Sequence, residues 1–489
     1  MTARPDIPAF AAGPLAARIE RQWDSDIIPQ LVDYIRIPAR SPHFDADWAK
    51  NGHIEAAVRQ AEKWVTAQAV KGLSLEIVRL GERTPVLFFD IPATGGLAGE
   101  RTVLFYGHLD KQPEMTGWRD GLGPWTPVIE DGKLYGRGGA DDGYAVFAAL
   151  SAVMALDAEG VARPRCVGII ETCEESGSYD LPAYLHALAP RMGDVQLVVA
   201  LDSGAGNFEQ LWVTTSLRGL VNGTLDVRIL EEGVHSGDAG GVVPSSFRIA
   251  RRILDRIDDS STGAVLPVAF HCDIPADRLE QARQAARILG DATWKRFPWV
   301  SCCDDAGANR VFAEPVTKDP VELILNRTWR AALAVTGADG LPPTNFAGNV
   351  QRPFTSLKLS LRLPPSVDAA SASEIFKQAL EADPPHGARV SFTCDSAATG
   401  WNAPSLTPWL SAALDAASQA SFGKPAAYMG EGGTIPFMGM LGVKFPNAQI
   451  LVTGVLGPKS NAHGPNEFLH LSYAKKVTVA TAMVIAAVR

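Results

Sequence analysis

The chain has 489 residues and a formal net charge of −9, because 45 lysines and arginines stand against 54 aspartates and glutamates. A chain of about 500 residues exceeds what one hydrophobic core usually organises, so its length predicts two or three domains. A hydrophobic share of 46% and a charged share of 20% exclude a mostly disordered or fibrous chain. The acidic balance argues against a nucleic-acid or membrane partner, since either would require a basic face.

The six cysteines are sparse and form no Cys-x-x-Cys motif, which predicts a reduced, cytoplasmic protein without a disulfide framework. Residues 1–13 contain no basic segment followed by an apolar run, so we expect no secretory signal. The apolar stretch at residues 477–488 is too short to span a bilayer and is interrupted by Thr481.

The first part of the chain alternates between helical and strand patterns. Apolar residues recur every four positions in residues 17–35, which predicts a helix, and residues 53–69 predict a second one. Short apolar runs bounded by turn residues or charges predict strands at residues 75–80, 86–91, 102–106, 165–170 and 196–200. Helical patterns at residues 144–157 and 181–188 lie between some of these runs. The alternation predicts an α/β domain with a mostly parallel sheet.

The middle of the chain has a different pattern. Strand, helix, strand, helix and strand are predicted in turn at residues 220–230, 245–257, 356–363, 372–380 and 389–394. This order is typical of a small α+β domain with one open sheet face. The last part returns to the first pattern, with strands predicted at residues 444–445 and 449–452. The simplest architecture is therefore an α/β domain interrupted by an inserted α+β domain.

Polar residues collect where the predicted strands of the α/β domain end. The strand at residues 102–106 leads into His108 and Asp110, whose side chains point to the same side because they are two positions apart. A glycine-rich turn later in the chain leads into Asp141 and Asp142 at the start of a helical pattern. A chance polar pair at a strand exit explains the first motif equally simply, and a helix N-cap aspartate explains the second.

Three further motifs have the same character. Glu174 and Glu175 follow a strand, Asp202 ends another, and His463 lies in a loop between asparagine, glycine and proline residues. Adjacent like charges repel unless a positive charge lies near them, so one glutamate of the pair could bind a cation while the other remains free as a base. A solvated acidic turn is the alternative reading of that pair.

Together the motifs provide two histidines and several carboxylates beyond the carboxyl ends of strands, where sites form in open α/β sheets. Nitrogen and oxygen ligands of this kind suit divalent cations, zinc first. Two such ions roughly 3.5–4 Å apart can generate hydroxide at neutral pH and polarise a carbonyl group. The motifs of serine hydrolases, P-loop proteins and His-Glu-x-x-His metalloproteases do not occur in the sequence.

The five motifs, in this order and spacing, resemble the M20 family of di-zinc metallopeptidases and aminoacylases, above all its carnosine-type dipeptidases. The resemblance covers nearly the whole chain. It implies a zinc-peptidase-like catalytic domain with a mostly parallel sheet, at residues 1–216 and 399–489. A ferredoxin-like α+β lid and dimerisation domain would be inserted at residues 217–398.

The resemblance also implies a role for each matching residue of the catalytic domain. Asp110 would hold and polarise His108, and Glu174 would be the general base that takes a proton from a zinc-bridging water. The metal ligands would be His108, Asp141, Glu175, Asp202 and His463. Asp141 would bridge both ions, and the peptide bond after it is typically cis in this family. The cofactors would be two zinc ions per subunit, with manganese or cobalt as alternatives.

In the lid, the resemblance implies that His235 stabilises the oxyanion of the intermediate, often in the partner subunit's active site. Arg362 would clamp the substrate carboxylate, although a solvated strand arginine would look the same in the sequence. The loop that would receive the carboxyl end of the substrate comprises Glu431, Gly432, Gly433 and Thr434.

The chain departs from many relatives at Gly143 and Tyr144, at Lys111, and after the strand at residues 389–394. These departures concern the surroundings of the substrate and leave the metal ligands intact. We therefore expect a homodimeric metal-dependent hydrolase that cleaves amide bonds of dipeptides or short peptides with a free carboxylate. The alternatives are an N-acyl or N-carbamoyl amino acid amidohydrolase with the same centre, and a non-catalytic metal-binding relative.

Overall fold

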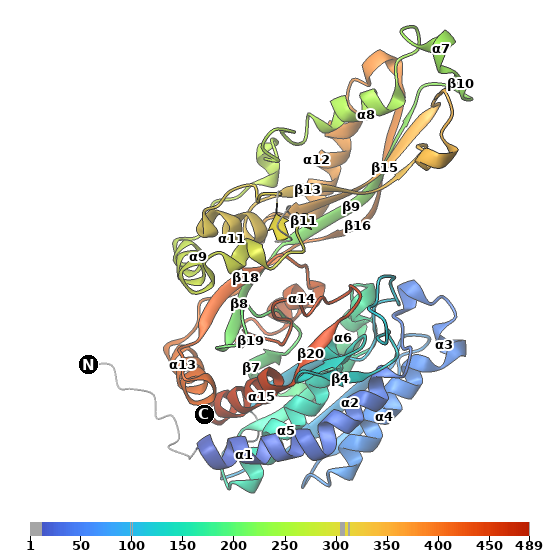
Figure 1. Cartoon of the computed structure of the whole chain (residues 1–489). Helices are drawn as coiled ribbons and strands as arrows, with labels where there is room; N and C mark the ends of the chain where they lie inside the picture. Colours follow the sequence, from blue (N-terminus) through green and yellow to red (C-terminus); the bar gives the residue numbers. More distant parts are fainter. Residues whose placement is uncertain (1–11, 98, 100, 304–308, 312, 489) are drawn as a thin grey trace. The chain divides into compact units, whose positions relative to one another are not determined.

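The computed structural model describes residues 12–97, 99, 101–303, 309–311 and 313–488 (Figure 1). Most of residues 1–13, for which no secretory signal is expected, lies outside the described part. Residue contacts divide the chain into two compact units. The first comprises residues 1–214, 403–429 and 440–489, and the second comprises residues 215–402 and 430–439.

The first unit is built around a six-stranded sheet in the order β1-β2-β6-β3-β7-β19. The pairs β6–β3, β3–β7 and β7–β19 are parallel, whereas β1 and β2 join antiparallel at one edge. The mostly parallel sheet predicted for this part of the chain is confirmed. Its strands are β1 (Ser74–Val78), β2 (Val86–Ile91), β3 (Arg101–His108), β6 (Arg165–Glu171), β7 (Asp194–Ala200) and β19 (Gln449–Val452).

Helices pack against this sheet, and the strands β2, β3, β6 and β7 are largely buried. In β3, every residue from Thr102 to His108 is buried, which explains why its sequence is a continuous apolar run rather than an alternation. Helices α1, α5 and α15 pack side by side (Figure 1). The helices of the first unit are α1 (Ala12–Gln22), α2 (Ile28–Ile35), α3 (Trp48–Asn51), α4 (His53–Ala67), α5 (Tyr144–Ala158), α6 (Leu181–Met192), α13 (Pro408–Phe422) and α15 (Leu471–Ala486), and α14 (Pro436–Lys444) has residues in both units.

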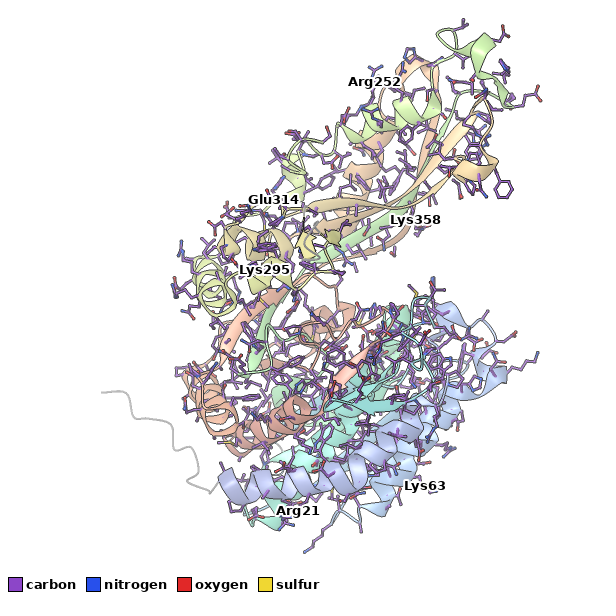
Figure 2. The ribbon with its side chains drawn as sticks, in the orientation of Figure 1. Arg21, Lys63, Arg252, Lys295, Glu314 and Lys358 are labelled. Carbon is purple, nitrogen blue, oxygen red and sulfur yellow. The ribbon has the colours of Figure 1, made fainter. Side chains whose placement is uncertain are left out.

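The first predicted helix is confirmed as a continuous helical segment, in which a π-helical turn at Trp23–Ile27 joins α1 to α2. The apolar residues that recur every four positions form its buried face. All of them are fully buried: Ile19, Trp23, Ile27, Leu31 and Ile35. Charged side chains such as Arg21 and Lys63 lie exposed on the helices of this unit (Figure 2).

The segment Gly139–Ala158 is long and apolar enough to cross a membrane by length and composition. In the structure 94% of its apolar window is buried. Core packing inside the first unit therefore accounts for its apolar character.

The second unit contains a four-stranded antiparallel sheet in the order β13-β15-β9-β16. Burial alternates along β9 and β15, so one face of the sheet covers the core and the other lies open. With α8 and α12 between the strands, the chain order is β-α-β-β-α-β, as in ferredoxin-like domains. The elements are β9 (Gly219–Arg228), α8 (Ser246–Leu254), β13 (Ala332–Asp339), β15 (Phe354–Leu363), α12 (Ala369–Glu381) and β16 (Arg389–Ala398).

Smaller elements complete the described part of the chain. Two short strand pairs are β10–β14 and β11–β12, and two three-stranded sheets have the orders β17-β8-β18 and β20-β5-β4. Their bounds are β4 (Val128–Glu130), β5 (Lys133–Tyr135), β8 (Trp212–Leu217), β10 (Val234–His235), β11 (Ser301–Cys303), β12 (Asn309–Val311), β14 (Val350–Gln351), β17 (Trp401–Asn402), β18 (Ala427–Glu431) and β20 (Phe468–His470). The further helices of the second unit are α7 (Ser236–Ala239), α9 (Ala276–Leu289), α10 (Ala292–Lys295) and α11 (Pro320–Thr328).

One predicted strand is wrong. Lys444 ends helix α14 rather than starting a strand at residues 444–445. The apolar residues before it have helical spacing, because Phe437, Met438 and Leu441 are all fully buried. Strand β13 had no prediction, and its residues are half-buried or exposed, so this edge strand shows no alternation between buried and exposed positions.

Candidate metal centre

The first pair of candidate residues lies at the carboxyl end of β3. His108 ends the strand, Asp110 follows it, and both are fully buried. The His108 Nδ1 atom lies 3.1 Å from the carbonyl oxygen of Asp110 and 3.5 Å from its carboxylate Oδ1. Because both of these neighbours are acceptors, Nδ1 carries the proton and Nε2 is left with a lone pair for a cation.

Asp110 also organises the loop that follows β6. Its two carboxylate oxygens accept hydrogen bonds from the backbone N–H groups of Glu174, at 3.1 Å, and Glu175, at 3.0 Å. The His-x-Asp motif and the Glu-Glu motif are 64 positions apart in the chain but are joined here. Strands β3 and β6 are parallel neighbours, so their carboxyl ends meet at the same edge of the sheet.

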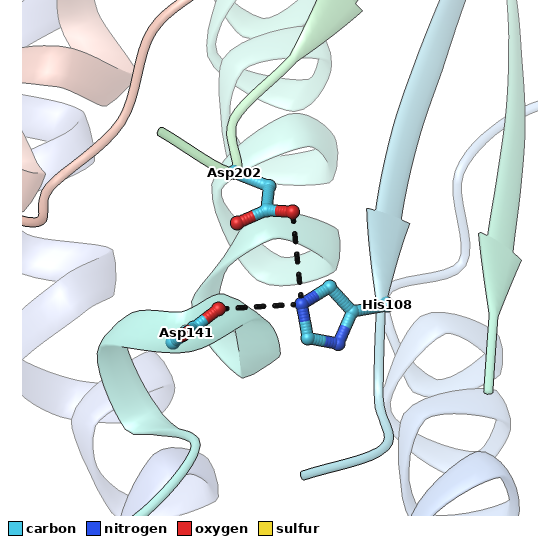
Figure 3. A group of neighbouring side chains, drawn as sticks. All are labelled: His108, Asp141 and Asp202. Carbon is cyan, nitrogen blue, oxygen red and sulfur yellow. Dashed lines mark ion pairs between the residues drawn. The ribbon is translucent and has the colours of Figure 1, made fainter. Parts of the chain in front are cut away.

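A first group of possible ligands consists of His108, Asp141 and Asp202, all buried (Figure 3). The Nε2 atom of His108 lies 3.4 Å from Asp141 Oδ1 and 3.8 Å from Asp202 Oδ2. One ligand atom from each residue lies within 4.8 Å of the others. Asp202 follows β7, so two neighbouring parallel strands deliver two of these three side chains.

A second group consists of Asp141, Glu175 and His463. The Nε2 atom of His463 lies 3.0 Å from Asp141 Oδ2 and 3.3 Å from Glu175 Oε2. Asp141 thus belongs to both groups, with Oδ1 facing His108 and Oδ2 facing His463. The peptide bond between Asp141 and Asp142 is cis.

Burial of several carboxylates in one place changes their acidity. Burial raises the pKa of Glu175 to about 8, and the charge of Asp141 contributes to the increase. Burial likewise raises the pKa of Asp202 to about 7, although His108 acts in the opposite direction. Protons therefore compensate part of the negative charge, and a bound cation would take over that role.

The donor atoms fit divalent cations. His108 Nε2 and Asp142 Oδ1 are buried, and neither has a hydrogen-bond partner among the described residues. A buried imidazole nitrogen without a hydrogen-bond partner destabilises the folded protein unless a ligand binds to it. Each group combines one imidazole nitrogen with carboxylate oxygens, a set that suits zinc and similar ions.

Glu174 lies next to the second group without belonging to it. Its carboxyl group makes no hydrogen bond or ion pair with another side chain of the described residues, whereas its backbone is fixed by Asp110. Burial and then the negative charge of Asp202 raise the pKa of Glu174 well above its usual range. A carboxylate that accepts protons readily and is not a ligand can act as a general base.

Two further residues that the sequence reading did not single out hold the second group together. Arg137 and Glu467 form a buried ion pair at 2.5 Å, with 1% and 0% of their side chains exposed. Arg137 also donates hydrogen bonds to the carbonyl oxygens of His463 and Gly464, at 3.0 and 2.9 Å. Glu467 accepts from the backbone N–H of Gly138, at 2.8 Å. The pair thereby joins the loop before Asp141 to the loop that carries His463.

His463 has a backbone φ of 64°, a conformation that residues other than glycine rarely adopt. The hydrogen bonds from Arg137 hold the carbonyl group of this residue. The ion pair therefore fixes the orientation of one candidate ligand.

Residues 104–487, which include all of these candidate ligands, match the peptidase family M20/M25/M40. The chain belongs to this family. The predicted membership is confirmed, and it identifies the chain as a metal-dependent hydrolase of the M20 type. The dinuclear M20 peptidase YXEP of Bacillus subtilis has the same fold at a TM-score of 0.53 and 11% identity.

The chain is similar to dipeptidases of the M20 family. It is 28% identical to the cysteinylglycine-S-conjugate dipeptidase of Corynebacterium striatum over 463 residues, which are 90% of this chain and 91% of that protein. Human Beta-Ala-His dipeptidase is 27% identical over 313 residues, 62% of this chain and 57% of that one. The structure of the dipeptidase Dug1p from Saccharomyces cerevisiae has a TM-score of 0.74 at 20% identity, with 98% of each chain covered.

Predicted substrate-binding residues of the M20 lid lie together in the second unit. The guanidinium group of Arg362 donates to Thr434 Oγ1 at 3.2 Å, and that hydroxyl donates to the carbonyl oxygen of Arg218 at 2.6 Å. The backbone N–H of Arg218 donates to the carbonyl oxygen of Glu431 at 3.3 Å. Arg362 is half-buried on β15, so it is more than a solvated strand arginine.

The remaining members of the predicted loop differ in exposure. Gly432 is half-buried, and a side chain there would approach the guanidinium group of Arg218 at 3.1 Å, whereas Gly433 is exposed. His235 ends β10 and is exposed, and its Nδ1 accepts a hydrogen bond from the backbone N–H of Gly237 at 3.2 Å. The Nε2 side of its ring therefore remains available as a donor.

Two departures from many M20 relatives lie in the core of the first unit. Lys111 is fully buried, and its Nζ donates to the carbonyl oxygens of Tyr34 and Ile37 at 2.8 Å each. A side chain at Gly143 would lie 2.1 Å from the Tyr34 ring, so only glycine fits there. Both departures therefore pack against the end of α2 inside the first unit, whereas the sequence placed them in the surroundings of the substrate.

Proposed function

We propose that this protein hydrolyses the amide bond of dipeptides or short peptides with a free carboxylate at a centre of two divalent cations. The observation that carries the proposal is the position of Asp141, whose two oxygens face two separate histidines. That arrangement suits one carboxylate shared between two ions, with Glu174 beside them. The similarity to dipeptidases over 90% of the chain supports the choice of substrate.

The residues divide the chemical work between them. The cations, held by His108, Asp141, Glu175, Asp202 and His463, would supply Lewis-acid polarisation and make water acidic enough to deprotonate at neutral pH. Glu174 takes the proton of the attacking water and returns it to the leaving amine. Asp110 keeps His108 in the tautomer and orientation that a ligand needs, and it fixes the backbone of Glu174.

Residues of the second unit act on the substrate in this proposal. His235 donates a hydrogen bond to the developing oxyanion, either in its own subunit or across a dimer. Arg362, with the loop at residues 431–434, binds the free carboxylate, for which a guanidinium group is geometrically suited. The 3.2 Å hydrogen bond between Arg362 and Thr434 supports placing these residues in one subsite.

We further propose a cytoplasmic homodimer with two zinc ions per subunit, manganese and cobalt being alternatives. The sparse cysteines support the location. Exposed apolar side chains in the second unit support self-association, among them Val335, Leu341 and Phe346. A monomeric mass in analytical ultracentrifugation would contradict the dimer, and elemental analysis of protein from cells would identify the metal.

A second candidate function uses the same centre on N-acyl or N-carbamoyl amino acids. It is favoured by 37% identity over 81 residues to the succinyl-diaminopimelate desuccinylase of Anaplasma marginale, although this covers only 17% of the chain. A mass-spectrometric screen of dipeptides against N-acyl amino acids, with zinc, manganese or cobalt added, separates the two functions. Absence of dipeptide cleavage under all three metals would reject the first.

The role of Glu174 can be tested separately. We expect Glu174→Ala to lower kcat by a factor of at least about 10³ while the metal content stays at the wild-type value, because the residue is a base and not a ligand. Elemental analysis and kcat with the best dipeptide are the two measurements. Loss of metal from this variant would show that the roles of Glu174 and Glu175 are reversed, and full activity would show that Glu174 is not the general base.

A further inference from the structure

Gln112 contacts a candidate metal ligand directly. Its side-chain amide donates a hydrogen bond of 2.6 Å to Oε2 of Glu175, which lies 63 positions further along the chain. The same oxygen lies 3.3 Å from Nε2 of His463, within the second group of candidate ligands. A carboxylate oxygen only accepts hydrogen bonds, so the amide must present its NH₂ group to Glu175. Gln112 is neither a candidate ligand nor a base, so any effect on the metal centre must pass through Glu175.

The backbone on both sides of Gln112 is held in place. On one side, the carbonyl oxygen of Lys111 accepts a hydrogen bond from the backbone N–H of Ser41 at 2.9 Å. On the other side, the carbonyl oxygen of Pro113 accepts a hydrogen bond from Nε of Arg137 at 3.2 Å. Because both of its neighbours are anchored, Gln112 presents its amide from a fixed position.

The two adjacent glutamates differ in how their side chains are held. Asp110 accepts hydrogen bonds from the backbone N–H groups of both Glu174 and Glu175, so their main chains are fixed in the same way. The carboxylate of Glu175 accepts the amide of Gln112, whereas the Glu174 carboxyl group makes no such bond to another side chain of the described residues. A ligand must keep one orientation, and a base must exchange protons. The restrained carboxylate therefore suits the ligand, and the free one suits the base.

The hydrogen bond also leaves room for a cation at Glu175. Each carboxylate oxygen has two lone pairs, and the amide of Gln112 uses one of those on Oε2. The other remains for an ion, as expected for a ligating carboxylate that is itself hydrogen-bonded. Only 3% of the Glu175 side chain is exposed, so little water can replace the amide.

We propose that Gln112 is a positioning residue that holds the Glu175 carboxylate in its orientation as a metal ligand and so leaves the role of base to Glu174. The inference rests on the proposed function, since it concerns the same centre of two cations. It adds the residue that distinguishes two adjacent glutamates whose main chains are held alike.

Gln112→Met tests the inference, because methionine is unbranched like glutamine but has no donor. The measurement is the pair of stepwise dissociation constants for zinc, obtained with the full-length protein by competition with a chromogenic chelator. We expect the constant of one ion to rise by about 10- to 100-fold, as is typical when a hydrogen-bond partner of a ligand is lost. The constant of the other ion should stay at the wild-type value. Unchanged constants for both ions would overturn the inference.

Gln60→Met is the matched control. Gln60 lies on α4, is half-buried like Gln112, and donates its amide to the carbonyl oxygen of Gln30 at 2.8 Å. The substitution therefore removes a similar hydrogen bond without affecting a partner of a candidate ligand, and both zinc constants should keep their wild-type values. Equal weakening of zinc binding in both variants would show a general effect of lower stability and overturn the role of Gln112.

A second variant keeps the inference testable if Gln112→Met does not fold. Gln112→Asn retains an amide, but its side chain is shorter by one methylene group, so the donor is withdrawn from Oε2 of Glu175. We expect the dissociation constant of one zinc ion to rise again, by a smaller factor than in Gln112→Met. Wild-type constants for both ions in Gln112→Asn would overturn the inference.

These measurements contain no substrate, so they separate the inference from the proposed function. A rise of one zinc constant in Gln112→Met, in a wild-type protein that cleaves no dipeptide, would support the positioning role and reject dipeptide hydrolysis. Unchanged zinc constants in the variant of a protein that does cleave dipeptides would overturn the positioning role alone.

Discussion

The two candidate functional clusters of this chain are built in opposite ways. The carboxylate–histidine cluster of the first unit (His108, Asp141, Glu175, Asp202 and His463) lies largely buried at the end of a parallel sheet. The candidate carboxylate site of the second unit (Arg218, Arg362 and Thr434) is half-buried and lies beside an antiparallel sheet. The first gathers negative charge and raises carboxylate pKa values, whereas the second gathers positive charge and lowers arginine pKa values.

This difference indicates two different kinds of ligand. Buried carboxylates with an orphaned imidazole nitrogen fit small cations that enter once and stay. Half-buried guanidinium groups remain accessible, so they fit an anionic group that binds and leaves during each turnover. Changes in the first cluster should therefore alter metal content, and changes in the second should alter substrate affinity alone.

The largest expected effect is at Asp141, which belongs to both ligand groups. We expect Asp141→Ala to lose both metals and to reduce kcat/KM by a factor of about 10⁴ or more, since removing a shared ligand dismantles both ion sites. Elemental analysis and dipeptide turnover measure this. Asp33→Ala, an exposed aspartate paired with Arg36, is the control and should retain metal and activity. Retention of one metal ion in Asp141→Ala would contradict the proposal that Asp141 is a ligand of both ions.

Arg137→Met tests the support of the first cluster. Removing one partner of a buried ion pair leaves Glu467 uncompensated, so we expect the free energy of unfolding to fall by about 3–5 kcal/mol. Urea denaturation of the metal-loaded protein measures the change, and metal titration should show weaker binding because His463 loses its two hydrogen bonds. The exposed pair of Arg119 and Glu130 provides the control, Arg119→Met, which should change neither quantity. Unchanged metal affinity in Arg137→Met would show that the ion pair stabilises the fold without orienting His463 for metal binding.

Thr434→Val tests the second cluster. The substitution keeps the shape of the side chain but removes the hydroxyl group between Arg218 and Arg362. We expect KM to rise by about three- to tenfold with unchanged metal content, because Arg362 loses the partner that orients it. Steady-state kinetics and elemental analysis decide the matter. A loss of metal from Thr434→Val would contradict the expectation that changes in the second cluster alter substrate affinity alone.

The smallest expected effect is a dependence of stability on pH. The raised pKa values of Glu175, about 8, and Asp202, about 7, mean that the metal-free folded state keeps protons that the unfolded chain releases. Between about pH 5 and 8 its free energy of unfolding should therefore fall as pH rises. Zinc displaces these protons, so the gain in Tm on adding zinc should grow by a few degrees from about pH 6 to 8. A gain independent of pH would show that these carboxylates are not ligands.

Much of the fold could be predicted because the apolar residues of a buried helix or strand recur with the period of that element. The run from residue 86 to 91 and the helix face from Ile19 to Ile35 are apolar at the positions that the structure buries. Where no face is buried, the pattern is missing. The edge strand β13 has exposed or half-buried residues throughout, so no alternation in the sequence indicated it.

The candidate site was recognised from motifs at strand ends, and the structure brings His108, Asp141, Glu175, Asp202 and His463 together in two groups. Residues that act through other residues could not be found in this way. Arg137 and Glu467 are 330 positions apart in the chain, and no local pattern relates them. Lys111 could be read only as a departure, because its buried carbonyl partners on Tyr34 and Ile37 belong to a distant segment.

The sequence by itself determined the class of each segment, the ligand types and their order along the chain, because spacing and residue chemistry are local properties. Only the tertiary structure decided that one carboxylate faces two histidines, that a buried ion pair holds one of them, and that Thr434 joins Arg218 to Arg362. The physical reason is that charges and hydrogen bonds act over a few ångströms in space. Parallel strands and packed loops bring residues within that range regardless of how far apart they are in the chain.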